Sequence, residues 1–296
     1  MSGAFQVGDS VLLVDHRGRE TVAELTEAGV VRTAVGEVAM GDLVGHEPGE
    51  AVVTSKGKRI LAVRPTLAET VVHMPRGAQI IYPKDALAIL GALDVAPGQR
   101  VLECGVGSGG LTVWLARLGA SVVAVERRPD FARRAEKNVA HLGGSERVSI
   151  IVGELADVAP PGPYDRVVLD MVHPWEVIPW IGAELAPGGR IVAYVTNALQ
   201  IHETVEALEA SGYVRIEVRE LLERRWVARG EIVRPELRMV AHTGFIVSAH
   251  ITPRARRLAA ERPREISVSG VVDDGSLDES ADGDVDDELI QTEDRP

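Results

Sequence analysis

The chain has 296 residues, 45% of them hydrophobic, which is enough for one large domain and a smaller one. It contains no apolar run as long as a membrane-spanning helix, and residues 1–6 lack the basic and apolar regions of a signal peptide. The net charge of −12 excludes a generally basic protein, and the single cysteine, Cys104, excludes an internal disulfide and fits the reducing cytoplasm, where we expect this protein to act.

The first 63 residues alternate short runs of Val, Leu and Ile with turns rich in Gly and Asp, as in Val11–Val14 and Ile60–Val63. This rhythm predicts a small antiparallel sheet or barrel over residues 1–63. Residues 64–78 are then interpreted as a connector, followed by a larger domain over residues 79–252.

The larger domain alternates apolar strand patterns with helical patterns, which predicts an α/β fold: a Rossmann-like, mainly parallel sheet with helices on both faces. The last two strand patterns are not separated by a helix-length crossover, so an antiparallel last strand is expected. Strands are predicted at 100–104, 121–126, 148–152, 166–170, 190–195, 213–220 and 239–249, and helices at 109–118, 130–142, 175–185 and 199–211.

A glycine-rich turn follows the first strand of this domain and leads into a helix. Glycines allow backbone amides to approach a ligand where a Cβ would block it, and a helix start offers unpaired N–H groups. The turn is therefore a candidate cradle for a nucleotide-type cofactor. Its candidate contacts are Glu103, Gly105, Val106, Gly107, Ser108, Gly109, Gly110 and Leu111.

Two cofactors compete for this cradle. The spacing of Gly105, Gly107 and Gly110 satisfies G-x-G-x-x-G, so a dinucleotide such as NAD is an alternative, although no group for handling a hydride is evident. Glu126, at the end of the next strand, suits ribose hydroxyls in either case. Glu103 favours S-adenosylmethionine (SAM), because a carboxylate there opposes a pyrophosphate but attracts the ammonium of a methionine moiety. The segment resembles motif I of class I SAM methyltransferases.

Two further acids follow predicted strands, where ligands of open α/β sheets bind. Glu154 comes after the third strand and is placed to receive the exocyclic amine of an adenine. Asp170 comes after the wholly apolar Val167–Leu169, so it emerges from a buried strand at the mouth of the pocket. An aspartate before a helix can instead act as its cap. The coincidence with the cofactor edge favours a functional role.

Three more segments carry a specific resemblance. Asp170–Trp175 (D-M-V-H-P-W), Gln79–Asp85 (Q-I-I-Y-P-K-D) and Arg234–Phe245 (R-P-E-L-R-M-V-A-H-T-G-F) resemble the motifs of bacterial tRNA adenine-58 N1-methyltransferases, with the actinobacterial members as the most similar. Together with motif I they extend over residues 79–245, and a small N-terminal β domain is also a trait of this family. The chain is identified as a member of it.

The resemblance implies that SAM donates a methyl group to N1 of the T-loop adenosine of tRNA. Adenine N1 already has an in-plane lone pair, so alignment of N1, methyl and sulfur is needed rather than a base. A carboxylate beside the purine can accept an N6–H bond and offset the positive charge formed on the ring. Asp170 is the candidate for this catalytic role and is also counted among the cofactor contacts. The family is typically a homotetramer, which is carried over as an expectation.

The resemblance also implies that the segment containing Gln79 and Tyr82 lies against the cofactor, with Tyr82 against the target base as well; Phe131 is added to the cofactor contacts. Trp175 is either a stacking residue or an anchor of the following helix in the core. Candidate phosphate contacts are Arg224, Arg225 and Arg234, for which solvated faces are the alternative. Isolated histidines without companions at ligand spacing give no expectation of a metal.

Residues 253–296 are expected to form a basic segment followed by a disordered acidic tail. Residues 273–296 hold eleven acids and one arginine, a net of −10, so that about −2 of the total −12 remains for residues 1–272. Any RNA-binding surface must therefore be local.

Three alternatives to this function remain: a SAM methyltransferase acting on a protein or small molecule, a non-catalytic tRNA-binding subunit, and the NAD oxidoreductase. The segments that begin at Asp170 and Arg234 disfavour the first alternative. The second is disfavoured by the intact residues Glu103, Gly105, Gly107, Glu126 and Asp170.

Overall fold

The computed structural model describes residues 3–264 except 78, 159 and 238. Within these ranges no helix is both long and apolar enough to cross a lipid bilayer. The predicted acidic tail and the end of the predicted basic segment lie outside the described residues.

The N-terminal region is built from short antiparallel strands, as its alternating pattern predicted. A four-stranded sheet has the order β2-β1-β6-β5, and a two-stranded sheet pairs β3 with β4. The buried side chains of Phe5, Leu13, Leu25, Leu43 and Ile60 form a separate core beneath these strands. The elements are β1 Ser10–Val14, β2 Glu20–Glu24, β3 Val30–Thr33, β4 Gly36–Ala39, the 3₁₀ turn η1 Met40–Asp42, β5 Ala51–Val53 and β6 Arg59–Val63.

Two helices precede the glycine-rich turn, and the sequence analysis predicted neither. Helix α1 (Leu67–His73) begins with a capping box: the Glu69 amide donates to the Thr66 hydroxyl, and the Thr66 amide donates to the Glu69 carboxylate. Helix α2 (Pro83–Leu93) has proline at its first position, where the missing N–H costs nothing. The stretch interpreted as a connector therefore contains an ordered helix.

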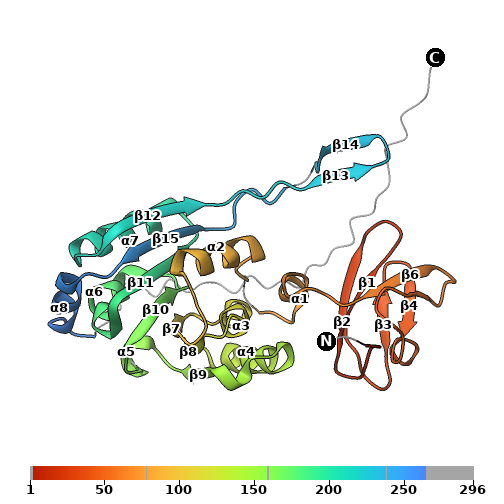
Figure 1. The fold of residues 1–296 in the computed structure, drawn as a ribbon, viewed down its shortest axis with the longest axis horizontal. Helices are drawn as coiled ribbons and strands as arrows, with labels where there is room; N and C mark the ends of the chain where they lie inside the picture. Colours follow the sequence, from red (N-terminus) through yellow and green to blue (C-terminus); the bar gives the residue numbers. More distant parts are fainter. Residues whose placement is uncertain (1–2, 78, 159, 238, 265–296) are drawn as a thin grey trace, which may run out of the picture. The chain divides into compact units, whose positions relative to one another are not determined.

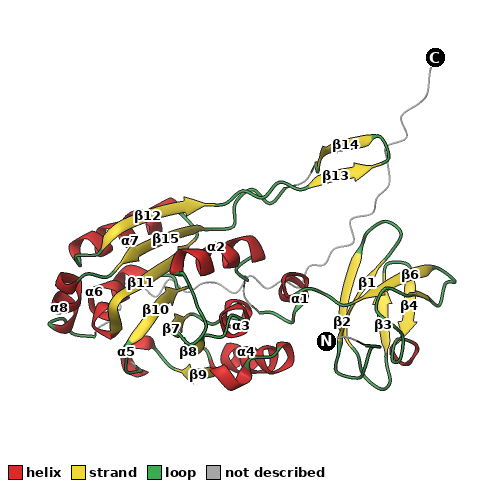
Figure 2. Ribbon diagram, in the orientation of Figure 1, coloured by secondary structure: helices red, strands yellow, loops and turns green. Residues whose placement is uncertain are grey.

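The larger sheet confirms the predicted α/β class, including the antiparallel strand. Its seven strands have the order β12-β15-β11-β10-β7-β8-β9, and β15 runs antiparallel to both of its neighbours, β11 and β12. Figure 2 shows the strands between layers of helices. The strands are β7 Arg100–Cys104, β8 Ser121–Glu126, β9 Val148–Val152, β10 Tyr164–Leu169, β11 Leu185–Val195, β12 Val214–Glu220 and β15 Phe245–His250.

Two apolar cores lie on opposite faces of this sheet. Ile89 and Leu93 of α2 pack with Leu115 on one face, whereas Ile178 and Leu208 belong to the other core. Apolar side chains on both faces explain why the central strands are almost entirely hydrophobic. The remaining helices are α3 Gly110–Arg117, α4 Pro129–Leu142, α5 Leu155–Val158, α6 Pro174–Ile181, α7 Ala198–Ala210 and α8 Pro253–Ala260, with 3₁₀ turns η2 Ser145–Arg147 and η3 Gly182–Glu184.

The chain between β12 and β15, the last two strands of the sheet in chain order, forms a projecting hairpin (Figure 1). Strands β13 (Trp226–Arg229) and β14 (Ile232–Pro235) pair antiparallel, and we call residues 221–244 the arm. The predicted strand over 239–249 begins too early, since β15 starts at Phe245. Met239 and Val240 are apolar but 44% and 57% exposed, so their pattern does not reflect burial in the sheet.

Candidate functional site

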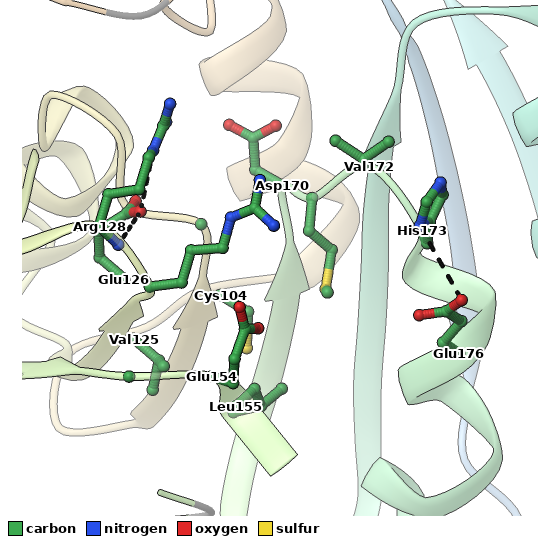
Figure 3. A pocket seen from close by; sticks show the side chains of 14 residues that line it. Cys104, Val125, Glu126, Arg128, Glu154, Leu155, Asp170, Val172, His173 and Glu176 are labelled. Atoms are coloured by element: carbon green, nitrogen blue, oxygen red, sulfur yellow. Dashed lines mark hydrogen bonds and ion pairs between the residues drawn. The ribbon is translucent and has the colours of Figure 1, made fainter. Parts of the chain in front are cut away.

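The carboxyl ends of β7, β8 and β10 meet at one edge of the sheet, and a cavity opens there (Figure 3). We call this edge the cofactor edge. Parallel strands place their ends together, which is why acids far apart in the sequence gather here. The lining residues include Gly105, Glu126, Glu154 and Asp170, all four predicted from the sequence.

The glycine turn after β7 is in direct backbone contact with the end of β10. Gly105 has a φ of +85°, and a Cβ at this position would lie 1.7 Å from the carbonyl oxygen of Asp170. The Asp170 amide in turn donates to the Cys104 carbonyl over 2.8 Å. Glycine is therefore required for both the conformation and the close approach, and this contact fixes Asp170 relative to the cradle.

Glu126 organises the turn from the end of β8. Its carboxylate accepts the amides of Gly107 at 2.9 Å and Arg128 at 3.0 Å, and the residue is 4% exposed. Each carboxylate oxygen has a second lone pair, so Glu126 can also accept the hydroxyls of a ribose at the cavity.

Glu103 lies one residue before the end of β7 and is 1% exposed. Its Oε2 has no hydrogen-bond partner within the residues that the structure describes. Burial is the main cause that raises the pKa of Glu103 to about 8; the nearby Thr112 side chain opposes the shift, and the carboxylates of Asp170 and Glu126 add to it. A buried acid with an unsatisfied oxygen is suited to a cationic ligand, so the site fits the methionine ammonium of SAM.

Asp170 lies immediately beyond β10 at the cavity. Burial, followed by the charge of Glu126, raises the pKa of Asp170 to about 7. The capping alternative does not hold, because α6 begins at Pro174 and its cap position is occupied by His173, three residues later. Asp170 is thus a half-buried residue at a ligand cavity, where a neighbouring cation would keep its carboxylate ionised.

Sequence reasoning missed the residues that close the cavity after Asp170. Met171 and Val172 line it directly, as does Glu176, which pairs with His173 at 3.9 Å (Figure 3). The His173 ring lies 5.0 Å from that of Trp175. The only feature of the sequence that could have indicated these cavity residues is their position in the turn and first helical residues after a strand end.

The first turn of α4 supplies an aromatic residue beside the cavity. The guanidinium of Arg128, a lining residue, lies 3.5 Å from the centre of the Phe131 ring. Phe131 is 7% exposed, so it supports the wall from behind Arg128.

The other cradle residues provide backbone and packing. Val106 and Leu111 are buried in the core against α2, and the Ser108 carbonyl accepts a hydrogen bond from the Asn138 side chain. Gly109 has a φ of +83°, and Gly110 begins α3.

None of the predicted substrate residues lines the cofactor cavity. Tyr82 lines a second cavity of about 560 Å³, together with Leu87 and Met239. Gln79 and Trp175 do not line the cofactor cavity either; Gln79 is exposed and Trp175 is half-buried. The three predicted phosphate contacts, Arg224, Arg225 and Arg234, are exposed on the arm.

Arg225 pairs with Glu223 over 3.4 Å, and Arg234 donates to the Pro235 carbonyl. Among the described residues no group of His, Cys, Asp and Glu is arranged to hold a metal ion.

Comparison with known proteins extends over most of the chain. The family described as tRNA methyltransferase complex GCD14 subunit matches residues 59–243, and the family described as TrmI-like N-terminal matches residues 3–52. The tRNA (adenine(58)-N(1))-methyltransferase TrmI of Thermus thermophilus is 38% identical over 242 residues, which cover 80% of this chain and 95% of that protein.

Two crystal structures share the fold along most of their length. A SAM-dependent O-methyltransferase from Thermotoga maritima has a TM-score of 0.80 and 34% identity, covering 84% of this chain and 94% of that one. The tRNA (m1A58) methyltransferase TrmI of Aquifex aeolicus has a TM-score of 0.76 and 26% identity, covering 84% and 99%.

Proposed function

This chain belongs to the TrmI/GCD14 family of tRNA methyltransferases, and on that premise we propose that it methylates N1 of adenosine 58 in the T-loop of tRNA. One structural observation carries the proposal: the backbone contact between Gly105 and Asp170 holds a carboxylate beside a cradle whose buried acid, Glu103, has an unsatisfied oxygen. The cofactor is SAM, which supplies an electrophilic methyl group when bound.

Three acids at the cofactor edge are assigned to three parts of this cofactor. Glu103 holds the methionine ammonium, Glu126 accepts from the ribose hydroxyls and Glu154 accepts from the adenine amine. The support for these roles is the burial of the first two acids and the exposed position of Glu154 on the cavity wall. Of the remaining predicted contacts, Phe131 is proposed to support the cavity wall behind Arg128. Gln79 and Tyr82 do not line this cavity, and their contact with the cofactor is proposed from the family resemblance alone.

Asp170 is proposed to act on the target adenine. Its carboxylate accepts the N6–H of the base and stabilises the positive charge that grows on the ring as N1 is methylated. Burial and the charge of Glu126 raise its pKa to about 7, and the positive charge of a bound SAM beside it would keep the acid ionised. Because the nucleophile is a lone pair already in the ring plane, Asp170 contributes orientation and electrostatics rather than proton removal before attack.

The tRNA is proposed to reach this edge with its target base turned out of the folded elbow. Tyr82 and Trp175 are assigned to base stacking, and Arg224, Arg225 and Arg234 to backbone phosphates. The arm exposes the apolar side chains of Trp226, Ile232 and Val233 at 56–67%, which supports contact with another protein surface. The homotetramer is proposed from the family resemblance.

A tRNA substrate and the single cysteine support a cytoplasmic protein. We retain the division into an N-terminal domain (1–63), a connector (64–78), a methyltransferase domain (79–252) and a C-terminal segment (253–296).

The proposal is tested with purified chain, SAM and an unmodified tRNA transcript. A methyl group on N1 blocks Watson–Crick pairing, so reverse transcription of the product should stop at position 58. A transcript with guanosine at that position is the matched control and should give no stop. A stop elsewhere, or no methyl transfer by this chain alone, would refute the assignment and would favour the non-catalytic subunit.

A further inference from the structure

Two of the sequence segments that carried the family resemblance meet in a buried polar cluster outside the cofactor cavity. Lys84 and Asp85 lie in the first turn of α2, Thr243 is next to the last residue of the arm, and Tyr194 lies on β11. We call these four residues the Lys84 cluster. Asp85 is fully buried and the Lys84 side chain is 11% exposed. Lys84 and Thr243 are 159 residues apart, so only the fold brings them together.

The direction of every hydrogen bond in the cluster is fixed by chemistry. The Asp85 carboxylate accepts from Lys84 Nζ at 2.8 Å, from Thr243 Oγ1 at 2.6 Å and from the Tyr194 hydroxyl at 3.1 Å. Because an ionised carboxylate only accepts hydrogen bonds, the single hydroxyl proton of Thr243 must be donated to Asp85. Its oxygen then accepts from Lys84 Nζ over 2.6 Å.

Lys84 has no donor left for a ligand. An ammonium group has three N–H bonds, and those of Lys84 point to Asp85, to Thr243 and to the Leu221 carbonyl at 2.8 Å. Although Lys84 lines the second cavity beside Tyr82, it is therefore not arranged to hold an RNA phosphate. Its contacts are directed at the protein itself.

The contacts of the Lys84 cluster join both ends of the arm to the cofactor edge of the sheet. Leu221 is the first residue of the arm and Thr243 is next to its last. On the other side, the β10–β11 register pairs Leu169 with Ala193, which places Tyr194 one step further, beside the position of Asp170. The Tyr194 ring also packs on Gly244, where a Cβ would lie 2.4 Å from it.

We propose that the Lys84 cluster is a positioning device for the RNA substrate: it fixes the root of the arm relative to Asp170 and so sets where the target adenosine is held. This rests on the proposed function, in which the arm binds tRNA. A buried ion pair adds little net stability but defines one geometry, because its partners must all be satisfied at once. Lys84, Asp85 and Thr243 act through the arm and not on the reacting atoms.

The test is Thr243→Val, which keeps the side-chain shape but removes the hydroxyl shared by Lys84 and Asp85. We expect kcat/KM for tRNA to fall at least about tenfold, since a displacement of about 1 Å can cost up to about 10²-fold. The Kd for SAM should stay within about twofold, because no cluster residue lines the cofactor cavity. Thr243→Ser, which restores the hydroxyl, should return kcat/KM to near the wild-type value.

Thr204→Val is the matched control. Thr204 is fully buried in α7 and its hydroxyl has no partner among the described residues, so its removal should change neither parameter. All variants are assayed below their measured unfolding temperatures, and Thr243→Ala replaces Thr243→Val if the latter does not fold.

Unchanged tRNA kinetics in the hydroxyl-free variant, equal loss in Thr243→Ser, or a parallel loss of SAM affinity would each overturn the proposal. Failure of the wild-type chain to methylate tRNA would instead count against the proposed function.

Discussion

The cofactor edge and the root of the arm are both built from buried charged groups, but they differ in whether those groups are satisfied. Glu103 at the cofactor edge keeps an oxygen without a partner among the described residues, and its neighbours are further acids. In the Lys84 cluster every proton of the ammonium and both hydroxyls has an acceptor. The first region leaves an oxygen available to a ligand, whereas the hydrogen bonds of the second are complete within the protein.

This difference separates two tasks. Groups left unsatisfied provide binding energy for a ligand, and satisfied groups provide a fixed geometry. Substitutions at the cofactor edge should therefore change chemistry or cofactor affinity, and substitutions at the arm root should change how the RNA is placed.

The largest effect is expected at Asp170. Asp170→Ala removes the group that offsets charge on the target base, so turnover should fall by on the order of 10²-fold or more, while the Kd for SAM stays within a few-fold. A tritiated-methyl assay and calorimetry measure the two quantities. Asp157→Ala, an exposed acid on the nearby α5, is the control and should behave as wild type. Near-normal turnover of Asp170→Ala would remove the catalytic assignment.

Gly105→Ala should be the next most damaging change. The added Cβ would overlap the Asp170 carbonyl, so the turn or the strand end must move, and both SAM affinity and thermal stability should fall. Gly98→Ala is a matched control, because Gly98 has a φ of +83° with nothing within 4 Å of the added atom. The free energy of unfolding of Gly98→Ala should fall only by the cost of the left-handed conformation, about 1–2 kcal/mol. Equal unfolding temperatures for the two variants would show that the contact with Asp170 is unimportant.

The cofactor edge is predictable from the sequence because its features depend on residues that are adjacent in the chain. The glycine turn before α3, the acid that ends β8 and the acids after β9 and β10 follow from strand patterns and the rule that ligands bind at strand ends. Helix α1 also has a local signal in the sequence, the capping pair Thr66 and Glu69.

The arm is less predictable for a physical reason. Met239 and Val240 have the apolar pattern of a strand, yet they are exposed, so pattern and burial disagree there. The contact between Lys84 and Thr243 depends on the order of the strands, and no periodic pattern in the sequence predicts it. The roles assigned to Tyr82, Trp175 and the arm arginines stay predictions.

A smaller effect is expected from Glu103 in the protein without cofactor. Its pKa is raised from 4.5 to about 8 on folding, so the folded chain holds a proton that the unfolded chain releases. Stability should therefore fall as pH rises from about 4.5 to about 8, with Asp170 adding to the fall up to about pH 7.

Glu103→Gln should flatten this dependence and weaken SAM binding, since the amide is neutral at every pH and cannot pair with the ammonium. Denaturant unfolding between pH 5 and pH 8 measures the slope. Glu146→Gln, an exposed glutamate of η2, should leave it unchanged, and an undiminished slope in Glu103→Gln would contradict the assignment.

The smallest effect is expected at the root of the arm, from the titration of His242. His242, next to Thr243, lies between the Glu220 carboxylate at its Nδ1 and the Thr196 carbonyl at its Nε2, both at 2.8 Å. Both partners offer acceptor oxygens, so this geometry favours the imidazole with protons on both ring nitrogens. Its hydrogen bond to Glu220 is the main cause that raises the pKa of His242, while Lys84 opposes the shift and the Phe245 ring lies alongside.

A raised pKa means that this link contributes its full stabilisation below the ordinary histidine pKa of about 6.5 and loses it as pH rises through the higher folded value. NMR titration of the ring should show that higher pKa, and Glu220→Gln should lower it towards 6.5. The Kd for tRNA should weaken over the same pH range in the wild-type chain and less in Glu220→Gln. If His242 titrates normally, the arm root is held by the Lys84 cluster alone and the contrast with the cofactor edge rests on that cluster.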